Sequence, residues 1–304
     1  MQLRYAAAQM AGILIALPGS EAHAQRLSQA VGLPLAKLEL RTFPDQEIYL
    51  RIDSDVQGLE VVIVGSLDKP GEKFLQVAFL AATARDLGAA RVGLVAPYLA
   101  FMRQDSRFLP GEGITSVYFG RMLSGLVDWL VTVDPHLHRW HSLDEVYSIP
   151  TRIARSAEAI ASWIKAHVER PLLVGPDAES HQWVSAVAEL CEAPFTVLEK
   201  TRRGDRDVSV SQLAAPWLDH TAVLLDDIIS TGRTMLEATK QVRAAGAPTA
   251  ICIGIHAVFA DAVQQELIAA GASQVVTCNT ISHLSNDICV GRAIAEATLL
   301  QLAA

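Results

Sequence analysis

Residues 223–235, VLLDDIISTGRTM, place two adjacent carboxylates at the end of an apolar run and follow them with a turn of small, hydroxyl-bearing residues. Asp226 and Asp227 can accept hydrogen bonds from the vicinal hydroxyls of a ribose. A turn that opens a helix offers backbone N–H groups to a phosphate, and Thr231 and Thr234 add hydroxyl donors. The alternative is a helix cap after a buried strand, but adjacent acids are costly to bury without a partner. The pattern favours a site for a phosphorylated sugar.

The elements that would position this site alternate along the chain. Short apolar runs, typical of buried parallel strands, are separated by stretches with helical spacing that often end at glycine. The apolar runs span residues 13–17, 61–65, 92–96, 129–134, 172–175, 222–227, 251–255 and 274–278. The helical stretches include residues 73–88, 116–126, 153–167, 179–191 and 234–246. This alternation predicts an α/β fold with helices on both faces of the sheet.

The pattern restarts near Pro150, after a polar stretch at residues 141–148, and this restart predicts a domain boundary. A chain of 304 residues is long enough for two domains, each with its own core. We predict an N-terminal domain at residues 1–148, a second domain at residues 149–284 and a final helix at residues 285–304.

Composition narrows the classes of partner. The net charge of −8 argues against nucleic acid and anionic membranes, so phosphate chemistry must depend on a few placed cations and backbone amides. The four cysteines are scattered without CxxC spacing, so we expect reduced, mostly buried thiols, which suit the cytoplasm.

The N-terminal segment has a second interpretation. Residues 1–25 contain a basic residue, an apolar run and an Ala-His-Ala that together resemble a signal peptide. Cleavage would delete residues 12–17, which have the pattern of a first buried strand, and residues 20–31, which have that of its helix. We therefore expect a cytoplasmic protein, and no apolar run is long enough to span a bilayer.

The 223–235 segment resembles the phosphoribosyl-diphosphate loop of the type I phosphoribosyltransferase fold. Two classes share this loop: the transferases, and the diphosphokinases that make their substrate. The resemblance implies that ribose 5-phosphate binds at Asp226, Asp227, Ser230, Thr231, Gly232, Arg233 and Thr234.

Residues 42–52, TFPDQEIYLRI, resemble the F-x-D-G-E segment of the ribose-phosphate diphosphokinase family. In that family the phenylalanine stacks on adenine and the acids bind near the nucleotide. Phe43, Asp45 and Glu47 would take those roles. Without further motifs, an aromatic residue and two acids before a strand commonly form a solvated turn.

Residues 97–107, PYLAFMRQDSR, resemble the PYxxYxRQD segment of the same family, whose arginine and glutamine contact ATP. Arg103 and Gln104 are the matching pair. A guanidinium suits phosphate oxygens, and with Asp105 it could equally form a structural ion pair.

Residues 132–138, TVDPHLH, resemble the family's TVDLH motif, and residues 174–177, VGPD, resemble its SPD motif. The resemblance implies that His136 and Asp177 reach the Mg²⁺ bound to ATP. Since Mg²⁺ prefers oxygen ligands, the phosphates must dominate its coordination.

Residues 199–206, EKTRRGDR, resemble the family's flexible catalytic loop, which closes over the transferred phosphates. Lys200 and Arg202 would be its catalytic cations. Cations placed against the charge that develops on phosphate oxygens supply most of the catalysis in phosphoryl transfer. A basic turn without a role is the alternative.

The family resemblance extends over residues 20–281 and implies two tandem type I phosphoribosyltransferase-like domains in a cytoplasmic homo-oligomer, a dimer or a multiple of it. The implied enzyme is a transferase of nucleotide biosynthesis with Mg²⁺, ATP and ribose 5-phosphate as ligands. The anomeric hydroxyl of ribose 5-phosphate would attack the β-phosphorus of ATP, and AMP would leave.

Three departures from the family pattern keep other functions open. Arg233 stands where the family usually has glycine, at a position suited to positive φ or close ligand approach. Ser230 replaces a common aspartate, and residues 138–148 do not match. A type I phosphoribosyltransferase and a catalytically silent regulatory homologue are therefore the alternatives, although Lys200 and Arg202 argue against the second.

Overall fold

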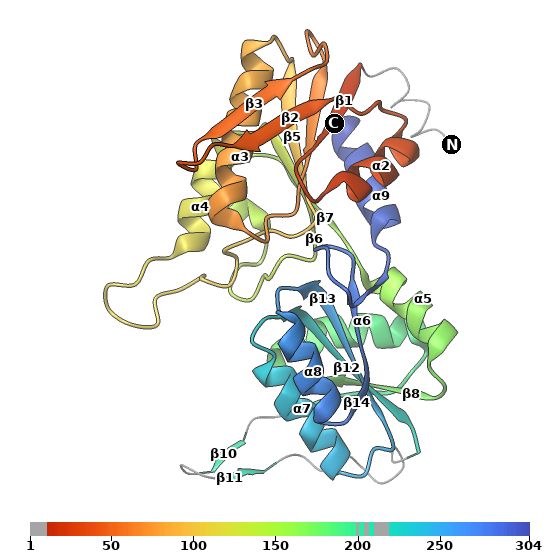
Figure 1. Ribbon diagram of the computed structural model, residues 1–304. Coiled ribbons are helices and arrows are strands. Elements are labelled where there is room, and N and C mark those ends of the chain that lie inside the picture. The colour runs from red at the N-terminus through yellow and green to blue at the C-terminus, as the bar shows by residue number, and fades with distance from the viewer. Residues whose placement is uncertain (1–10, 199–200, 204–206, 210–218) are drawn as a thin grey trace. The chain divides into compact units, whose positions relative to one another are not determined.

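The structure, a computed structural model, describes residues 11–198, 201–203, 207–209 and 219–304 (Figure 1). The chain divides into two compact units, the first formed by residues up to Ala154 together with Gly291–Ala304, the second by Arg155–Val290. The boundaries predicted from the sequence, after residues 148 and 284, lie six residues before those of the structure. The final helix, predicted at residues 285–304, begins at Gly291 and belongs to the first unit, because residues 286–288 form an edge strand of the second sheet.

The first unit is built on a parallel sheet of five strands in the order β1-β4-β5-β6-β7. They are β1 (Gly12–Ala16), β4 (Glu60–Val64), β5 (Arg91–Ala96), β6 (Trp129–Val133) and β7 (Thr151–Ala154). The strands β4 and β6 are buried along their whole length, which explains why they are nearly continuous apolar runs. Residues 153 and 154, predicted as helix, belong to β7 because the helix begins only at Ala157.

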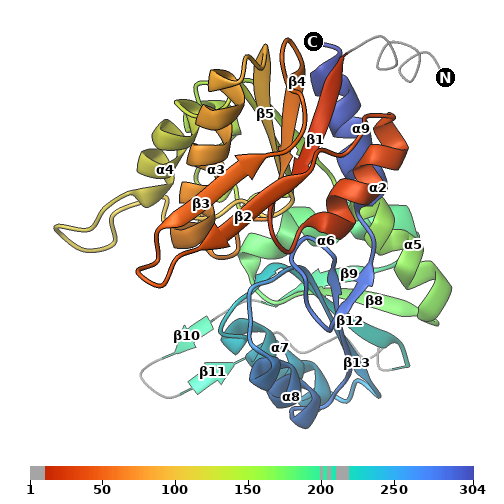
Figure 2. The ribbon, with the colours of Figure 1, turned by 45° about the horizontal axis from the view of Figure 1, so that its top comes forward.

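Helices cover both faces of this first sheet. On one face α2 (Glu21–Val31) and α9 (Gly291–Leu302) lie side by side, and on the other lie α3 (Pro70–Asp86) and α4 (Thr115–Ser124) (Figures 1 and 2). A separate antiparallel hairpin, β2 (Leu38–Thr42) and β3 (Ile48–Ile52), packs beside α3. A 3₁₀ turn, Leu143–Glu145, precedes β7.

Residues 12–31 form β1 and α2, as the pattern predicted. Leu14 and Ile15 are fully buried, and β1 pairs with β4 along all five of its residues. This segment is therefore part of the first hydrophobic core, which argues against its removal as a signal peptide. In the described part of the chain, no helix is both long and apolar enough to cross a membrane.

The second unit contains a six-stranded parallel sheet in the order β15-β14-β13-β12-β8-β9. Its strands are β8 (Pro171–Gly175), β9 (Phe195–Val197), β12 (Thr221–Ile229), β13 (Ala250–Ala257), β14 (Ala272–Cys278) and β15 (Asn286–Ile288). A short antiparallel pair, β10 (Thr201–Arg203) and β11 (Asp207–Ser209), stands apart from this sheet.

The strand order of the second sheet reverses between β8 and β12. From β8 the chain moves to β9 through α6 (His181–Cys191), whereas from β12 it moves the other way to β13 through α7 (Arg233–Ala244). The helix α5 (Ala157–His167) packs on α6, and α8 (Asp261–Ala269) packs beside α7. Ligands of open α/β sheets bind at such a reversal, beyond the carboxyl ends of the strands.

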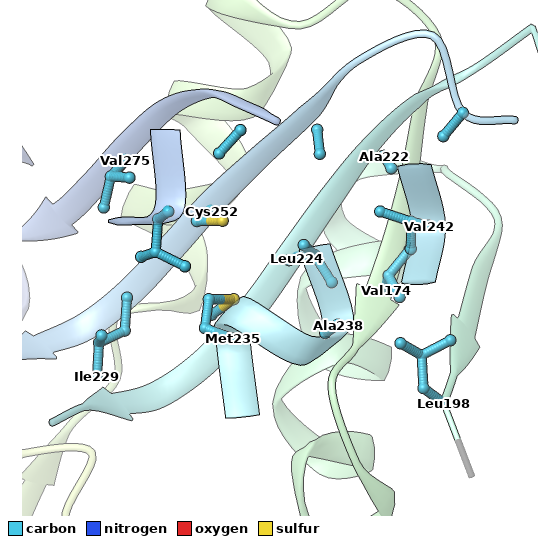
Figure 3. Close-up of a cluster of buried hydrophobic side chains, with 14 of the residues drawn as sticks. Val174, Leu198, Ala222, Leu224, Ile229, Met235, Ala238, Val242, Cys252 and Val275 are labelled. Atoms are coloured by element: carbon cyan, nitrogen blue, oxygen red, sulfur yellow. The ribbon is translucent and has the colours of Figure 1, made fainter. Parts of the chain in front are cut away.

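The core under α7 fixes this helix on the sheet (Figure 3). Met235 and Val242 are buried on one side of α7 and pack with Leu224 of β12 and Cys252 of β13. Because Met235 lies in the first turn, its burial also fixes where the amino end of α7 meets the carboxyl end of β12. The core therefore positions the turn between the two elements.

Candidate active site

Three carboxylates meet at the strand reversal of the second sheet. Asp226 and Asp227 lie within β12, which continues to Ile229, so the strand is longer than the predicted run of residues 222–227. Asp177 follows β8 and accepts a hydrogen bond from the backbone N–H of Glu179 at 3.1 Å. The Asp226 carboxylate accepts from the N–H of Asp227 at 3.0 Å.

The electrostatics of this cluster favour a ligand that donates hydrogen bonds or carries positive charge. Burial raises the pKa of the Asp226 carboxyl well above its usual range, and the negative charges of Asp227 and Asp177 raise it further. Ribose hydroxyls would donate to these oxygens, and a cation would offset their mutual repulsion.

The turn from β12 to α7 has the properties of an anion site. Gly232 is the N-cap residue of α7, with φ of 71°, and no side chain caps the helix. The first-turn N–H groups of a helix have no intrahelical partner, and its positive end attracts anions. Ser230, Thr231 and Thr234 surround this turn with hydroxyls. The predicted phosphate loop is therefore a helix N-terminus next to the acidic pair.

Arg233 does not occupy a strained backbone position. The positive φ of the turn falls on Gly232, and Arg233 is the first residue of α7, outside the set of residues with positive φ. A Cβ atom on Gly232 would lie 2.2 Å from Cγ1 of Val263, so this glycine is required twice, for conformation and for space. The positive φ considered for Arg233 from the sequence is therefore absent, and its exposed side chain adds a cation at the turn.

The β2–β3 hairpin presents the aromatic segment of the first unit. Phe43 is 37% exposed, with the Arg41 guanidinium 4.7 Å from its ring centroid and Tyr49 at 6.4 Å in an edge arrangement. Asp45 accepts from the N–H of Glu47 at 3.1 Å, as in an Asx turn. Both acids are exposed, so the solvated turn weighed as the alternative is present, and it holds the Phe43 ring at the surface.

One residue of this turn departs from the family pattern with a physical cost. Gln46 stands at the glycine position of F-x-D-G-E and has φ of 75°. That region of φ favours glycine, because the Cβ of other residues crowds the backbone there.

The segment after β5 carries Arg103 and Gln104. Both are exposed, and Thr115 at the start of α4 donates to the side-chain oxygen of Gln104. Phe101 has φ of 65°, a strained value for an aromatic residue, and its ring packs on Phe119 at 4.9 Å. Within the described ranges Arg103 makes no ion pair.

The ion pair considered between Arg103 and Asp105 does not form. Asp105 is buried and instead pairs with Arg139, whose Nη1 lies 2.7 Å from Asp105 Oδ1. Arg139 lies in the segment after β6, which also carries His136, stacked on His138 at 5.2 Å. Arg103, Gln104 and His136, predicted from separate motifs, thus lie in the segments that follow the neighbouring strands β5 and β6, and the Arg139–Asp105 ion pair joins these two segments.

Comparisons with known proteins agree over both units. The N-terminal domain of ribose phosphate pyrophosphokinase matches residues 13–126, and the phosphoribosyl transferase domain matches residues 142–291. The ribose-phosphate pyrophosphokinase of Saccharolobus solfataricus is 34% identical over 270 residues, covering 87% of this chain and 91% of the relative. That of Sulfurisphaera tokodaii is 30% identical over 270 residues, covering 88% and 92%.

The chain belongs to the ribose-phosphate pyrophosphokinase family. The crystal structure of phosphoribosylpyrophosphate synthetase from Mycobacterium smegmatis has the same fold, with a TM-score of 0.83 at 21% identity and coverage of 96% of this chain and 98% of that one. The family, the enzyme class and the fold of two phosphoribosyltransferase-like domains predicted from the sequence are confirmed.

The resemblance to pyrophosphokinases implies that Mg²⁺ binds, and the side chains of this chain limit where it could be held. Within the described residues no three His, Cys, Asp or Glu side chains form a group that could hold a metal ion. The two predicted contacts lie in different units, His136 in the first and Asp177 in the second. The crowded carboxylates beside Asp177 fit a hard cation that keeps most of its ligands on phosphates and water, as Mg²⁺ does, but form no closed cage.

Of the two predicted catalytic cations, Lys200 and Arg202, the structure describes the backbone of only one. Lys200 lies outside the described residues, and Arg202 lies in β10, where its backbone pairs with Val208 of β11. The roles of these residues remain predictions. Sequence reasoning missed Arg139 because it lies in the segment that departs from the family pattern, and no motif marks it.

Proposed function

We propose that this chain transfers the β,γ-diphosphate of ATP to the anomeric hydroxyl of ribose 5-phosphate, giving 5-phosphoribosyl 1-diphosphate and AMP. The observation that carries the proposal is the acidic pair of β12 beside the uncapped α7 terminus, in a chain that matches pyrophosphokinase relatives over both units.

The sugar phosphate would bind in the second unit. Asp226 and Asp227 would accept hydrogen bonds from the ribose hydroxyls, which relieves part of the cost of burying the two acids together. The 5-phosphate would accept from the first N–H groups of α7 and from the hydroxyls of Ser230, Thr231 and Thr234.

The nucleotide would bind through the first unit. The exposed Phe43 ring offers one face to adenine, and Arg103 and Gln104 offer donors to the phosphates and ribose. Asp45 and Glu47 would lie near the nucleotide.

In the reaction the anomeric oxygen attacks the β-phosphorus in line, the bond from that phosphorus to the oxygen bridging to the α-phosphate breaks, and AMP leaves. The hydroxyl proton is released to solvent or to the leaving phosphate. Lys200 and Arg202 would place positive charge against the transferring group, and Arg233 adds a cation at the sugar-phosphate loop. Mg²⁺ bound to ATP, with Asp177 and His136 as candidate protein contacts, would neutralise charge on the phosphate oxygens.

The wider setting is proposed on the same basis. We infer a cytoplasmic homo-oligomer that binds neither nucleic acid nor membranes, since the net charge of −8 disfavours both surfaces.

The normal φ of Arg233 weakens the case for a silent regulatory homologue, because positive φ was one of the two reasons to expect glycine at this position. A phosphoribosyltransferase would need the β12–α7 turn but would leave the Phe43 hairpin and Arg103 without a role.

The test is AMP formation by the purified chain with MgATP, with and without ribose 5-phosphate, beside a Lys200→Ala variant. We expect AMP that depends on ribose 5-phosphate and is lost in the variant. Nucleotide binding without AMP at any phosphate concentration would make the regulatory homologue the better assignment.

A further inference from the structure

Arg139 joins two loops that leave neighbouring strands. Its Nη1 donates to Asp105 Oδ1 at 2.7 Å across 34 residues of sequence, and its guanidinium carbon lies 5.2 Å from the centroid of the Phe108 ring. The Arg139 side chain is 49% exposed, whereas that of Asp105 is 1% exposed. The Asp105 side chain is therefore held in the interior, whereas the Arg139 side chain is half exposed to solvent.

Asp105 needs this partner. Its other carboxylate oxygen, Oδ2, is buried and has no hydrogen-bond partner within the described part of the chain. An ionised carboxylate in such a place attracts any cation within reach, and its interaction is strong because water does not screen it.

The nearest other cations along the chain are Arg103 and Arg107, each two positions from Asp105, and Arg107 already donates to the backbone oxygen of Glu112 at 2.9 Å. Arg103 is exposed and makes no ion pair with a described residue, although an acid lies so close to it. The internal bonds of this loop do not involve Arg103: Ser116 donates to the backbone oxygen of Gln104, and Glu112 accepts from the N–H groups of Phe108 and Leu109.

We propose that Arg139 is a positioning residue for nucleotide binding, which occupies Asp105 and so leaves the Arg103 guanidinium available to the phosphates of ATP. The inference rests on the proposed function, because it assigns Arg103 to the nucleotide. Without Arg139, the Asp105 carboxylate would pair with Arg103 and compete with the nucleotide for it.

The proposal predicts how ATP binding should change in two single variants and in the double variant. Arg139→Ala should weaken ATP binding, Asp105→Asn should leave it near that of the original chain, and the double variant should restore it, because the competing acid is then absent. A role limited to holding the loops together predicts the opposite, since the double variant would lack the tie between them altogether.

The experiment is calorimetric titration of the full chain with ATP in excess Mg²⁺ and without ribose 5-phosphate, so that no turnover occurs. We expect Kd to rise about tenfold in Arg139→Ala, as for loss of one charge-assisted hydrogen bond, and to return to within about twofold in the double variant. Arg139→Lys should rescue most of the effect, and Arg121→Ala, which removes an exposed arginine of α4, is the matched control. In steady-state assays KM for ATP should follow Kd, while kcat and KM for ribose 5-phosphate stay within about twofold.

An unchanged Kd in Arg139→Ala would overturn the inference, and so would a double variant as weak as the single one. If Arg139→Ala does not fold by circular dichroism, the comparison of Arg139→Lys with the double variant decides by the same criteria. If the original chain forms AMP but the variants do not follow this pattern, the inference about Arg139 is wrong and the proposed function is unaffected. A chain that binds no ATP would overturn both.

Discussion

The substitution Gly232→Ala tests whether the β12–α7 turn is built as the structure shows. An alanine at φ of 71° enters the left-handed region, which costs L-residues about 1–2 kcal/mol. Alanine also restricts the unfolded chain more than glycine does, and this stabilises the folded state by about 0.4–1 kcal/mol. The new Cβ would also lie 2.2 Å from Cγ1 of Val263, an overlap in the class of overpacked substitutions that cost about 1–3 kcal/mol. We expect a net loss of about 1–4.5 kcal/mol in the free energy of unfolding.

Two further variants separate these contributions. Gly19→Ala has a similar φ of 81° with nothing within 4 Å of the new Cβ, so it should cost only the backbone part, about 0–1.5 kcal/mol. Adding Val263→Ala to Gly232→Ala should recover the steric part but not the backbone part. The assay is urea unfolding followed by circular dichroism, with Val263→Ala alone as the reference.

Ribose 5-phosphate binding by Gly232→Ala should fall along with stability, because the same turn carries the α7 terminus. Most surface substitutions change the free energy of unfolding by less than about 0.5 kcal/mol. A change that small in Gly232→Ala would refute the reasoning. If Gly232→Ala costs as much in the Val263→Ala background as in the original chain, the assignment of the overlap to Val263 is wrong.

Three other predictions follow from single residues. Gln46→Gly should raise the free energy of unfolding by a few tenths to about 1 kcal/mol in urea, because φ of 75° suits glycine, and a loss of stability would contradict this. The folded-state pKa of Asp226 is raised, so this carboxyl destabilises the folded chain progressively as pH rises from about 4 through the folded pKa. Asp226→Asn should therefore gain stability relative to the original chain over that window, measured by thermal unfolding in EDTA, while losing activity; a difference that does not change with pH would contradict the charge crowding. Burial raises the pKa of Cys252 to about 12, so Ellman's reagent at pH 8 should label the exposed Cys289 rapidly and Cys252 only after unfolding. Rapid labelling of Cys252 in the native chain would show that its core opens.

Much of the fold was predictable from local pattern. The buried strands β4, β6 and β12 are apolar runs, and α7 begins directly after the small residues that mark a turn. The types and adjacency of Asp226 and Asp227 predict a ligand, because two adjacent acids are unfavourable in a buried strand without one.

The error at residues 153 and 154 has a local cause. These residues form an edge strand that pairs only with β6 and is followed at once by α5, so helical spacing continues into the strand without a break in composition. Periodicity cannot separate two short elements that adjoin in this way.

What the sequence by itself determined is the set of parts: apolar runs, acidic pairs, a glycine turn and the motifs of a pyrophosphokinase, all of which depend on residues close together along the chain. Only the tertiary structure decided which parts meet. Asp177 approaches Asp226 because β8 and β12 are neighbours, and Arg139 reaches Asp105 because β5 and β6 are neighbours. Strand order arises from packing of the whole sheet, and no short segment contains it.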